Sequence, residues 1–347
     1  MRKFKSSMVL SVLGGFLAVN LLMFIGVAKA KSVEIKLSSA LAPGSCLELA
    51  ADKFKELVEK SSGGEITVVR YPSGELYDPK GEIEAVARGN IAMGVLHVAY
   101  VGGRSPILEF ISSFGAQGCW DDPEHYYRFI DQAEIKEIAN REFRDKLNAE
   151  LLAMLPYGLA MVGNTKHPIK KVEDFKGLKL RTSGSAQANM YRALEVIPTE
   201  MSSGEVYMGL QRGTIDGATS GPARWYLSKW YEVCPYLTQD YSVPYLTFWL
   251  AINSSIWDGL SPSHQNILKN AAKEVQVWSR SYSVKETQQA YDKLAASKQV
   301  KEIIFFDKKE VARVTEIVKP VMRDLLVKRI GKENAEQLFS LLEQARQ

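Results

Sequence analysis

The sequence predicts an α/β fold of two similar domains, and three observations support this prediction. Segments typical of strands and of helices alternate along the chain. A short pattern, "ARGNIAMG" at 87–94, recurs as "QRGTIDGA" at 211–218, each time with an Arg-Gly pair where a helix is expected to end. An apolar stripe over 261–296 predicts a helix too long for one small domain.

Residues 1–30 have the three parts of a secretory signal. A basic start at residues 2–5 precedes the uncharged apolar run Met8–Val27, and Ala28-Lys29-Ala30 follows as a small-residue cleavage site. The apolar run is longer than the usual signal core, so an uncleaved membrane anchor is the alternative. We predict export, with cleavage after Ala30.

The positive net charge of the chain comes from the basic residues of this N-terminal segment. The formal net charge is +4, and residues 1–30 carry four basic residues and no acid, so the mature chain is neutral. A neutral balance argues against a nucleic-acid partner, because phosphate binding requires a basic surface. Residues 31–347 are numerous enough for two domains that each have a core.

The first half of the mature chain has the order strand, helix, strand, helix, strand. This order is typical of parallel strands with helices on both faces of a sheet. We expect strands at Val33–Ser38, Glu65–Tyr71 and Ile91–Val95, with helices at Cys46–Lys60 and Gly81–Arg88.

The same alternation continues further along the chain. We expect strands at Leu151–Tyr157, Leu178–Leu180 and Thr214–Ala218, and helices at Ser185–Leu194 and 203–212. From Ser261 a much longer helix begins, with Pro262 in its first turn. A helix of some 30 residues is about 45 Å long, so we expect it to lie across both domains.

Arg181 is the sharpest candidate for a binding residue. It stands between the strand Leu178–Leu180 and the helix Ser185–Leu194, where ligands bind in sheets of this kind. The start of the helix offers free N–H groups, and the guanidinium can pair two hydrogen bonds with a carboxylate. The sequence therefore predicts a carboxylate site, and the alternative is a structural salt bridge to a nearby Asp or Glu.

Other polar residues are weaker candidates. His97 and Tyr100 follow the strand Ile91–Val95 and are either ligand contacts or ordinary surface groups. Glu205 is expected to complete a capping box with Ser202, and Asp216 to cap its own turn. The other three histidines are expected at the surface: His125, His167 and His264.

The cysteines and the missing motifs argue against several kinds of site. Cys46, Cys119 and Cys234 match no metal motif and no disulfide framework, and a pairing of Cys46 with Cys119 stays open. The chain has no Gly-x-Ser-x-Gly, His-Glu-x-x-His, Gly-x-Gly-x-x-Gly or phosphate-loop motif. We therefore expect neither a cofactor nor a metal, and no enzymatic activity.

Four segments carry a resemblance to a known family. They are "YPSGELYD" (71–78), "HPIKKVEDFKGLKLRTS" (167–183), "GEVYMGLQRGTIDGA" (204–218) and "KWYEVCPYLT" (229–238). With them the chain resembles, over nearly all of 33–347, the dicarboxylate-binding solute-binding proteins of tripartite ATP-independent periplasmic (TRAP) transporters, the DctP type.

The resemblance implies a periplasmic-binding-protein-like fold. Two α/β domains are joined by crossing hinge strands and share a long helix. On this sequence the implied domains are 31–157 with about 247–285, and 158–246 with about 286–347.

The resemblance also implies a set of ligand contacts. The family's carboxylate-clamping arginine falls on Arg181, and further contacts fall on Ser39, His97, Tyr100 and Ser220. Sialic-acid binders of the family carry a second arginine at a position that is Ala160 here, which argues against a sialic acid. The expected ligand is a small aliphatic or aromatic monocarboxylate held chiefly by Arg181.

The implied function is capture of an organic acid in the periplasm. The two domains close over the acid, and the protein delivers it to the membrane permease subunits of the transporter. The alternatives are an exported enzyme that acts on a small acid and a sensor subunit that presents the acid to a membrane receptor.

Overall fold

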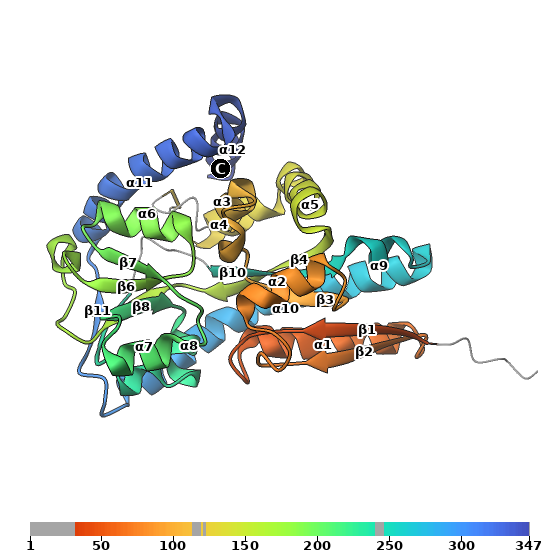
Figure 1. The fold of residues 1–347 in the computed structure, drawn as a ribbon, viewed down its shortest axis with the longest axis horizontal. Helices are drawn as coiled ribbons and strands as arrows, with labels where there is room; N and C mark the ends of the chain where they lie inside the picture. The colour runs from red at the N-terminus through yellow and green to blue at the C-terminus, as the bar shows by residue number, and fades with distance from the viewer. Residues whose placement is uncertain (1–31, 113–118, 121–122, 240–245, 347) are drawn as a thin grey trace, which may run out of the picture. The chain divides into compact units, whose positions relative to one another are not determined.

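Two β-sheets and the helices around them make up the described chain (Figure 1). The computed structural model describes residues 32–112, 119–120, 123–239 and 246–346. The predicted signal and its cleavage site lie outside these residues. None of the described helices has the length and apolar character needed to cross a membrane.

The first sheet has the strand order β2-β1-β3-β10-β4. The strands β1 (Val33–Ser38), β2 (Ile66–Tyr71) and β3 (Met93–Leu96) are parallel, as predicted, and the helices α1 (Cys46–Ser61) and α2 (Pro79–Ala87) connect them. The sheet is completed by β4 (Ala149–Gly158) and β10 (Leu246–Asn253).

The second sheet has the order β11-β9-β5-β8-β6-β7. Three of its strands are each followed by a helix that starts at the carboxyl end of the strand: α6 (Ser185–Ala193), α7 (Val206–Arg212) and α8 (Pro222–Leu227). The strands are β5 (Met161–Asn164), β6 (Lys179–Thr182), β7 (Ile197–Glu200), β8 (Gly217–Ser220), β9 (Tyr236–Gln239) and β11 (Glu302–Phe305).

Each sheet contains one strand that runs against its neighbours, which the expectation of parallel strands did not include. In the first sheet it is β10, antiparallel to β3 and β4, and in the second it is β5, antiparallel to β8 and β9. Both strands come directly after the chain has changed sheets, from β4 to β5 and from β9 to β10. The links before these two strands, residues 159–160 and 240–245, are shorter than the crossover of a dozen or more residues that joins parallel strands.

The predicted long helix is α10 (Pro262–Ala295), with 34 residues. Ser261 caps it by accepting a hydrogen bond from the backbone N–H of His264. Its buried Val275 belongs to a core shared with the first sheet, and Leu294 belongs to a core of the second. The helix therefore packs against both sheets, as expected, and Figure 1 shows it passing from one to the other.

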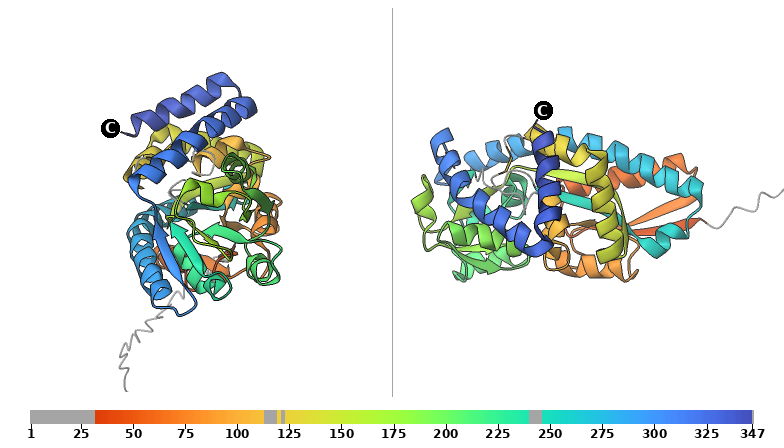
Figure 2. Two further views of the ribbon diagram at one scale, coloured as in Figure 1. Left: turned by 90° about the vertical axis from the view of Figure 1, so that its left-hand side faces the viewer. Right: turned by 90° about the horizontal axis from the view of Figure 1, so that it is seen from above.

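The remaining helices lie around the two sheets, and the last two of them end the described chain. They are η1 (Val98–Val101), α3 (Pro106–Ile111), α4 (Pro123–Asp131), α5 (Ala133–Leu147), η3 (Val172–Phe175), η4 (Trp230–Glu232), α9 (Ser254–Asp258), α11 (Lys308–Ile330) and α12 (Lys332–Gln344). Figure 2 shows α12, in dark blue, turning back from the end of α11, and the two helices are in contact.

The C-terminal helix packs with elements from the first half of the chain. Leu338 and Phe339 of α12 belong to one core with Phe110 of α3 and Phe129 of α4. From Ser32 onward the chain forms one unit by its contacts, so the predicted division into two domains stays a prediction.

The same packing shows that the prediction for His125 was wrong. This side chain of α4 is fully buried, with its Nε2 2.9 Å from the carbonyl oxygen of Leu342 in α12. The surface prediction failed because the neighbouring helix comes from more than two hundred residues further along the chain.

Candidate functional site

A small cavity lies where strand ends of the two sheets meet. It has a free volume of about 40 Å³ and is lined from both sides. Its lining residues are Ala40, Leu41, Pro79, His97, Tyr157, Leu246 and Phe248 from elements of the first sheet, and Arg181, Ser183, Gln187, Ser203, Thr219, Ser220 and Arg224 from elements of the second.

Arg181 lies near the carboxyl end of β6 and is only 2% exposed. Its Nε donates a hydrogen bond to the carbonyl of Met201 (2.8 Å), and its Nη2 donates to the hydroxyl of Tyr100 (2.6 Å). Within the described residues Nη1 has no hydrogen-bond partner, and no carboxylate forms an ion pair with this guanidinium. The alternative of a structural salt bridge is therefore not found.

The start of α6 is less free than the sequence suggested. The backbone N–H of Ser183 is bound by the side-chain oxygen of Gln187 (2.8 Å), and the N–H of Ala186 by the carboxylate of Glu109 (2.9 Å). Two N–H groups at the start of this helix are thus occupied by side chains of the protein itself.

Two predicted site residues, Tyr100 and His97, follow β3 of the first sheet and lie near Arg181. Tyr100 of η1 accepts the hydrogen bond from Arg181 and a second, of 3.3 Å, from the backbone N–H of Ser203. His97 is 9% exposed and stacks on Phe248, with ring centres 4.5 Å apart. Burial lowers the pKa of His97 to about 3, and the charge of Arg181 acts in the same direction. The imidazole is therefore neutral at physiological pH.

Arg224, in the first turn of α8, is a site residue that sequence reasoning missed. Its Nη2 donates to the hydroxyl of Ser203 (3.1 Å), and its Nε is buried with no hydrogen-bond partner in the described part of the chain. Burial lowers the pKa of this guanidinium, and Arg181 lowers it further. The sequence did hold a signal for Arg224. This residue stands at a junction of a strand and a helix, after β8 and in the first turn of α8, and Arg181 stands at a similar junction between β6 and α6.

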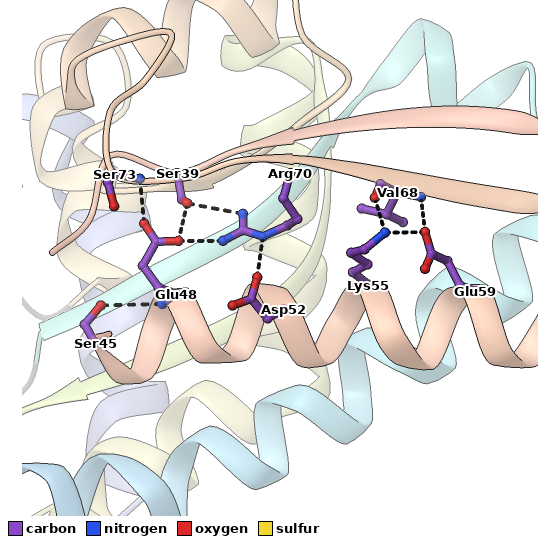
Figure 3. Close-up of polar contacts among 9 residues, drawn as sticks. All are labelled: Ser39, Ser45, Glu48, Asp52, Lys55, Glu59, Val68, Arg70 and Ser73. Atoms are coloured by element: carbon purple, nitrogen blue, oxygen red, sulfur yellow. Dashed lines mark hydrogen bonds and ion pairs between the residues drawn. The ribbon is translucent and has the colours of Figure 1, made fainter. Parts of the chain in front are cut away.

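Ser220 lines the cavity as expected, but Ser39 does not. The hydroxyl of Ser39 donates to Glu48 (2.8 Å) and accepts from Arg70 (3.2 Å), and Arg70 also forms an ion pair with Glu48 (2.5 Å) (Figure 3). Glu48 further accepts the backbone N–H of Ser73. Ser39 therefore anchors the loop after β1, while the next two residues of that loop face the cavity.

Two other expectations concern residues beside the site. Glu205 accepts the backbone N–H of Ser202 (3.1 Å), which is one half of the predicted capping box and confirms its structural role. Asp216 does not cap its own turn. Its carboxylate accepts the backbone N–H of Lys179 in the neighbouring strand β6 (2.9 Å) and so ties two strands together.

Among the residues that the structure describes, the cysteines and potential metal ligands form no second centre. Cys46, Cys119 and Cys234 are all buried and free, so Cys46 and Cys119 do not pair in this structure. Among the residues that the structure describes, no group of three or more histidine, cysteine or acidic side chains is arranged to hold a metal ion.

Comparisons with known proteins agree with this architecture. A family model described as bacterial extracellular solute-binding protein, family 7, matches residues 37–329. The C4-dicarboxylate-binding periplasmic protein DctP of Rhodobacter capsulatus is 30% identical over 337 residues, covering 94% of this chain and 95% of that protein.

Solved structures show the same fold. The sugar acid binding protein DctPAm from Advenella mimigardefordensis, in complex with galactonate, has a TM-score of 0.83 at 25% identity, covering 91% of this chain and 99% of that one. A TRAP periplasmic solute-binding protein from Sulfurospirillum deleyianum with bound succinate has a TM-score of 0.81 at 22% identity, covering 89% and 99%.

These similarities confirm the predicted family and the two-sheet α/β fold with its long helix. The relatives are named as binding proteins and not as enzymes, which agrees with the expectation of no enzymatic activity. The chain belongs to the bacterial extracellular solute-binding proteins of family 7, with the DctP-type proteins of TRAP transporters as its relatives.

Proposed function

We propose that this protein captures an organic acid in the periplasm and delivers it to the membrane permease of a TRAP transporter. The observation that carries the proposal is the charge of the cavity. Arg181 and Arg224 both line it, and none of its lining residues is acidic. Burying a cation without a partner costs free energy, and the carboxylate of a ligand would remove that cost.

Arg181 is the proposed clamp for the carboxylate. Met201 and Tyr100 hold two of its nitrogens and fix the plane of the guanidinium. The remaining nitrogen, Nη1, is left to donate to a ligand. A fixed guanidinium of this kind loses little side-chain freedom when the ligand binds.

Capture is proposed to occur by closure of two domains around the cavity, with α10 and the two sheet crossings as the hinge. The proposed domains are 31–157 with about 247–285, and 158–246 with about 286–347. The lining residues support this proposal because they come from elements of both sheets.

Export by residues 1–30, with cleavage after Ala30, is part of the proposal. N-terminal sequencing of the secreted protein should give Lys31 as the first residue. A membrane-bound protein that retains Met1 would instead favour an uncleaved anchor.

The expected ligand is a small aliphatic or aromatic monocarboxylate held chiefly by Arg181. The free volume of about 40 Å³ is well below the roughly 150 Å³ of a cavity that holds benzene. This difference favours a small aliphatic acid over an aromatic one in the conformation described.

Calorimetric titration tests the clamp. Mass spectrometry of small molecules released from the denatured protein, together with a thermal-shift screen of organic acids, would supply the ligand. Arg181→Ala should weaken binding by about 30-fold or more, because it leaves a buried anion without its partner. Arg181→Lys should recover only part of the affinity, since an ammonium cannot contact Met201, Tyr100 and the ligand together.

Arg192→Ala, which removes an exposed arginine from α6, is the matched control and should bind as the wild type does. Unchanged affinity in Arg181→Ala, with a normal unfolding curve, would contradict the proposed clamp. Delivery is tested by uptake of the acid into proteoliposomes that carry the permease, which should require the wild-type protein.

A further inference from the structure

A second cavity lies between helix α8 and the long helix α10, which pack against each other. It has a free volume of about 140 Å³, against about 40 Å³ for the cavity at Arg181. Its walls include Tyr226 of α8 and Tyr282, Glu286 and Lys293 of α10. The two cavities share no lining residue, so this one is a separate site.

Glu286 is a buried acid on the wall of this cavity, with 9% of its surface exposed. Its Oε1 accepts the backbone N–H of Cys46 at the start of α1 (2.6 Å). Its Oε2 is buried and has no hydrogen-bond partner among the described residues. A buried acceptor without a partner is rare in native proteins and points to a missing donor.

The charge of Glu286 is only partly offset by the protein. Burial raises the pKa of this carboxyl to about 7, although the N–H of Cys46 and the charge of Lys293 act in the opposite direction. A buried carboxylate without a paired cation is costly. A positively charged ligand beside Oε2 would remove that cost.

The aromatic walls of the cavity suit a cation. Nζ of Lys293 lies over the ring of Tyr226, 5.1 Å from its centre, so one wall already holds an ammonium group. Stacking on Tyr231 fixes the ring of Tyr226, with ring centres 5.6 Å apart. Stacking on Trp278 fixes the ring of Tyr282 in the same way, at 4.7 Å. The negative face of an aromatic ring attracts cations.

We propose that this cavity binds a small organic ammonium ion, with the carboxylate of Glu286 as its charge partner and the rings of Tyr226 and Tyr282 as its walls. The N–H groups of the ion donate to Oε2. The free volume is close to the roughly 150 Å³ of a cavity that holds benzene, so a cation of about five or six heavy atoms fits. A divalent metal ion does not fit the site, because such an ion requires several oxygen ligands and Glu286 is the only acidic residue among those that line the cavity.

Calorimetric titration with n-butylammonium chloride and with 1-butanol, at constant ionic strength, tests the inference. The two probes have nearly the same shape and differ in charge. At a pH above the pKa of about 7 of Glu286, the wild type should bind n-butylammonium about 10-fold or more tightly than 1-butanol, as expected for a hydrogen bond between charged groups. Glu286→Gln keeps an acceptor for the N–H of Cys46 and removes the charge, so it should reduce this preference to about 2-fold or less.

Three further variants control the comparison. Lys285→Gln removes an exposed lysine of α10 that does not line the cavity and should leave the preference unchanged. Lys293→Gln removes the ammonium group that lies over Tyr226 and should strengthen binding of n-butylammonium by about 2- to 5-fold. Tyr226→Leu removes the ring and should weaken that binding by a similar factor while it changes the binding of 1-butanol little. With the wild-type preference itself, Tyr226→Leu decides the outcome if Glu286→Gln does not fold.

Three results would overturn the inference. In the first, n-butylammonium binds the folded wild type no better than 1-butanol does. In the second, the preference survives in folded Glu286→Gln. In the third, n-butylammonium binds Lys293→Gln but not the wild type, which would mean that the side chain of Lys293 itself fills the site. These titrations contain no organic acid, so the proposed function stands or falls separately.

Discussion

Tyr100 and Arg181 form a 2.6 Å hydrogen bond, although one follows a strand of the first sheet and the other belongs to the second. The hydroxyl of Tyr100 also accepts the backbone N–H of Ser203. One phenol therefore joins the two sides of the cavity directly at the proposed clamp.

Tyr100→Phe should weaken binding of the organic acid by about 3- to 10-fold. The change removes a hydrogen bond worth about 0.5–1.5 kcal/mol, which both orients Arg181 and joins the two sides. Calorimetric titration measures the effect. Tyr207→Phe on α7 is the control, because within the described part of the chain that hydroxyl makes only a long contact to Glu232 (3.5 Å). Equal affinity in Tyr100→Phe and wild type would show that this bond does not support the clamp.

Gly184→Ala should impair ligand binding without loss of folding. A Cβ at this position would lie 2.2 Å from the carbonyl oxygen of Ala99, which comes from the other side of the cavity. The backbone of Gly184 is extended (φ −173°) and accepts any residue, so the effect arises from this contact alone. We expect the two sides to be held apart and the affinity to fall by about 10-fold or more.

The control for this variant is Gly103→Ala, because a Cβ at Gly103 would meet no atom within 4 Å. Its affinity and its thermal midpoint should equal those of the wild type. Tight binding by Gly184→Ala would mean that the ligand does not require the close contact between Gly184 and Ala99.

Glu109→Ala should destabilise the protein by about 3 kcal/mol or more. Glu109 is fully buried, accepts the backbone N–H of Ala186 and forms a 2.8 Å ion pair with Arg329, which also donates to Ser185. Removing one partner leaves the other charge uncompensated. Urea unfolding measures the loss.

Two variants calibrate that measurement. Glu109→Gln keeps an acceptor for the N–H of Ala186 and should lose less stability than Glu109→Ala. Glu336→Gln, at an exposed site on α12, should change stability by less than about 0.5 kcal/mol. An equally small change in Glu109→Ala would mean that the junction of α3, α6 and α11 does not depend on this carboxylate.

Glu82 should make stability depend on pH. Burial raises the pKa of this carboxyl from 4.5 to about 8 in the folded protein. The folded state therefore binds the proton more tightly than the unfolded state, and the contribution of Glu82 to the free energy of unfolding falls as the pH rises from 4.5 to 8. Urea unfolding across this range should show a smaller decrease in the free energy of unfolding for Glu82→Gln than for wild type.

Glu56→Gln, on the exposed face of α1, is the control and should follow the wild-type profile. Parallel profiles for Glu82→Gln and wild type would contradict a raised pKa at Glu82.

Local patterns in the sequence determined the alternation of strands and helices, the 34-residue helix α10 and the position of Arg181 at a strand end. Each of these depends on neighbours within a few turns or on the order of adjacent elements. Periodicity and capping residues report such relations directly. The family resemblance added the sheet crossings, which no local pattern shows.

Only the tertiary structure decided which polar groups face the cavity. Glu109 reaches the start of α6 from 77 residues away, and Arg70 draws Ser39 away from the cavity from 31 residues away. Arg224 lines the cavity because α8 begins directly after β8, and β8 pairs with β6, the strand of Arg181. Such long-range contacts depend on how sheets and helices pack in three dimensions. They cannot be predicted from the residues that are near each group in the sequence.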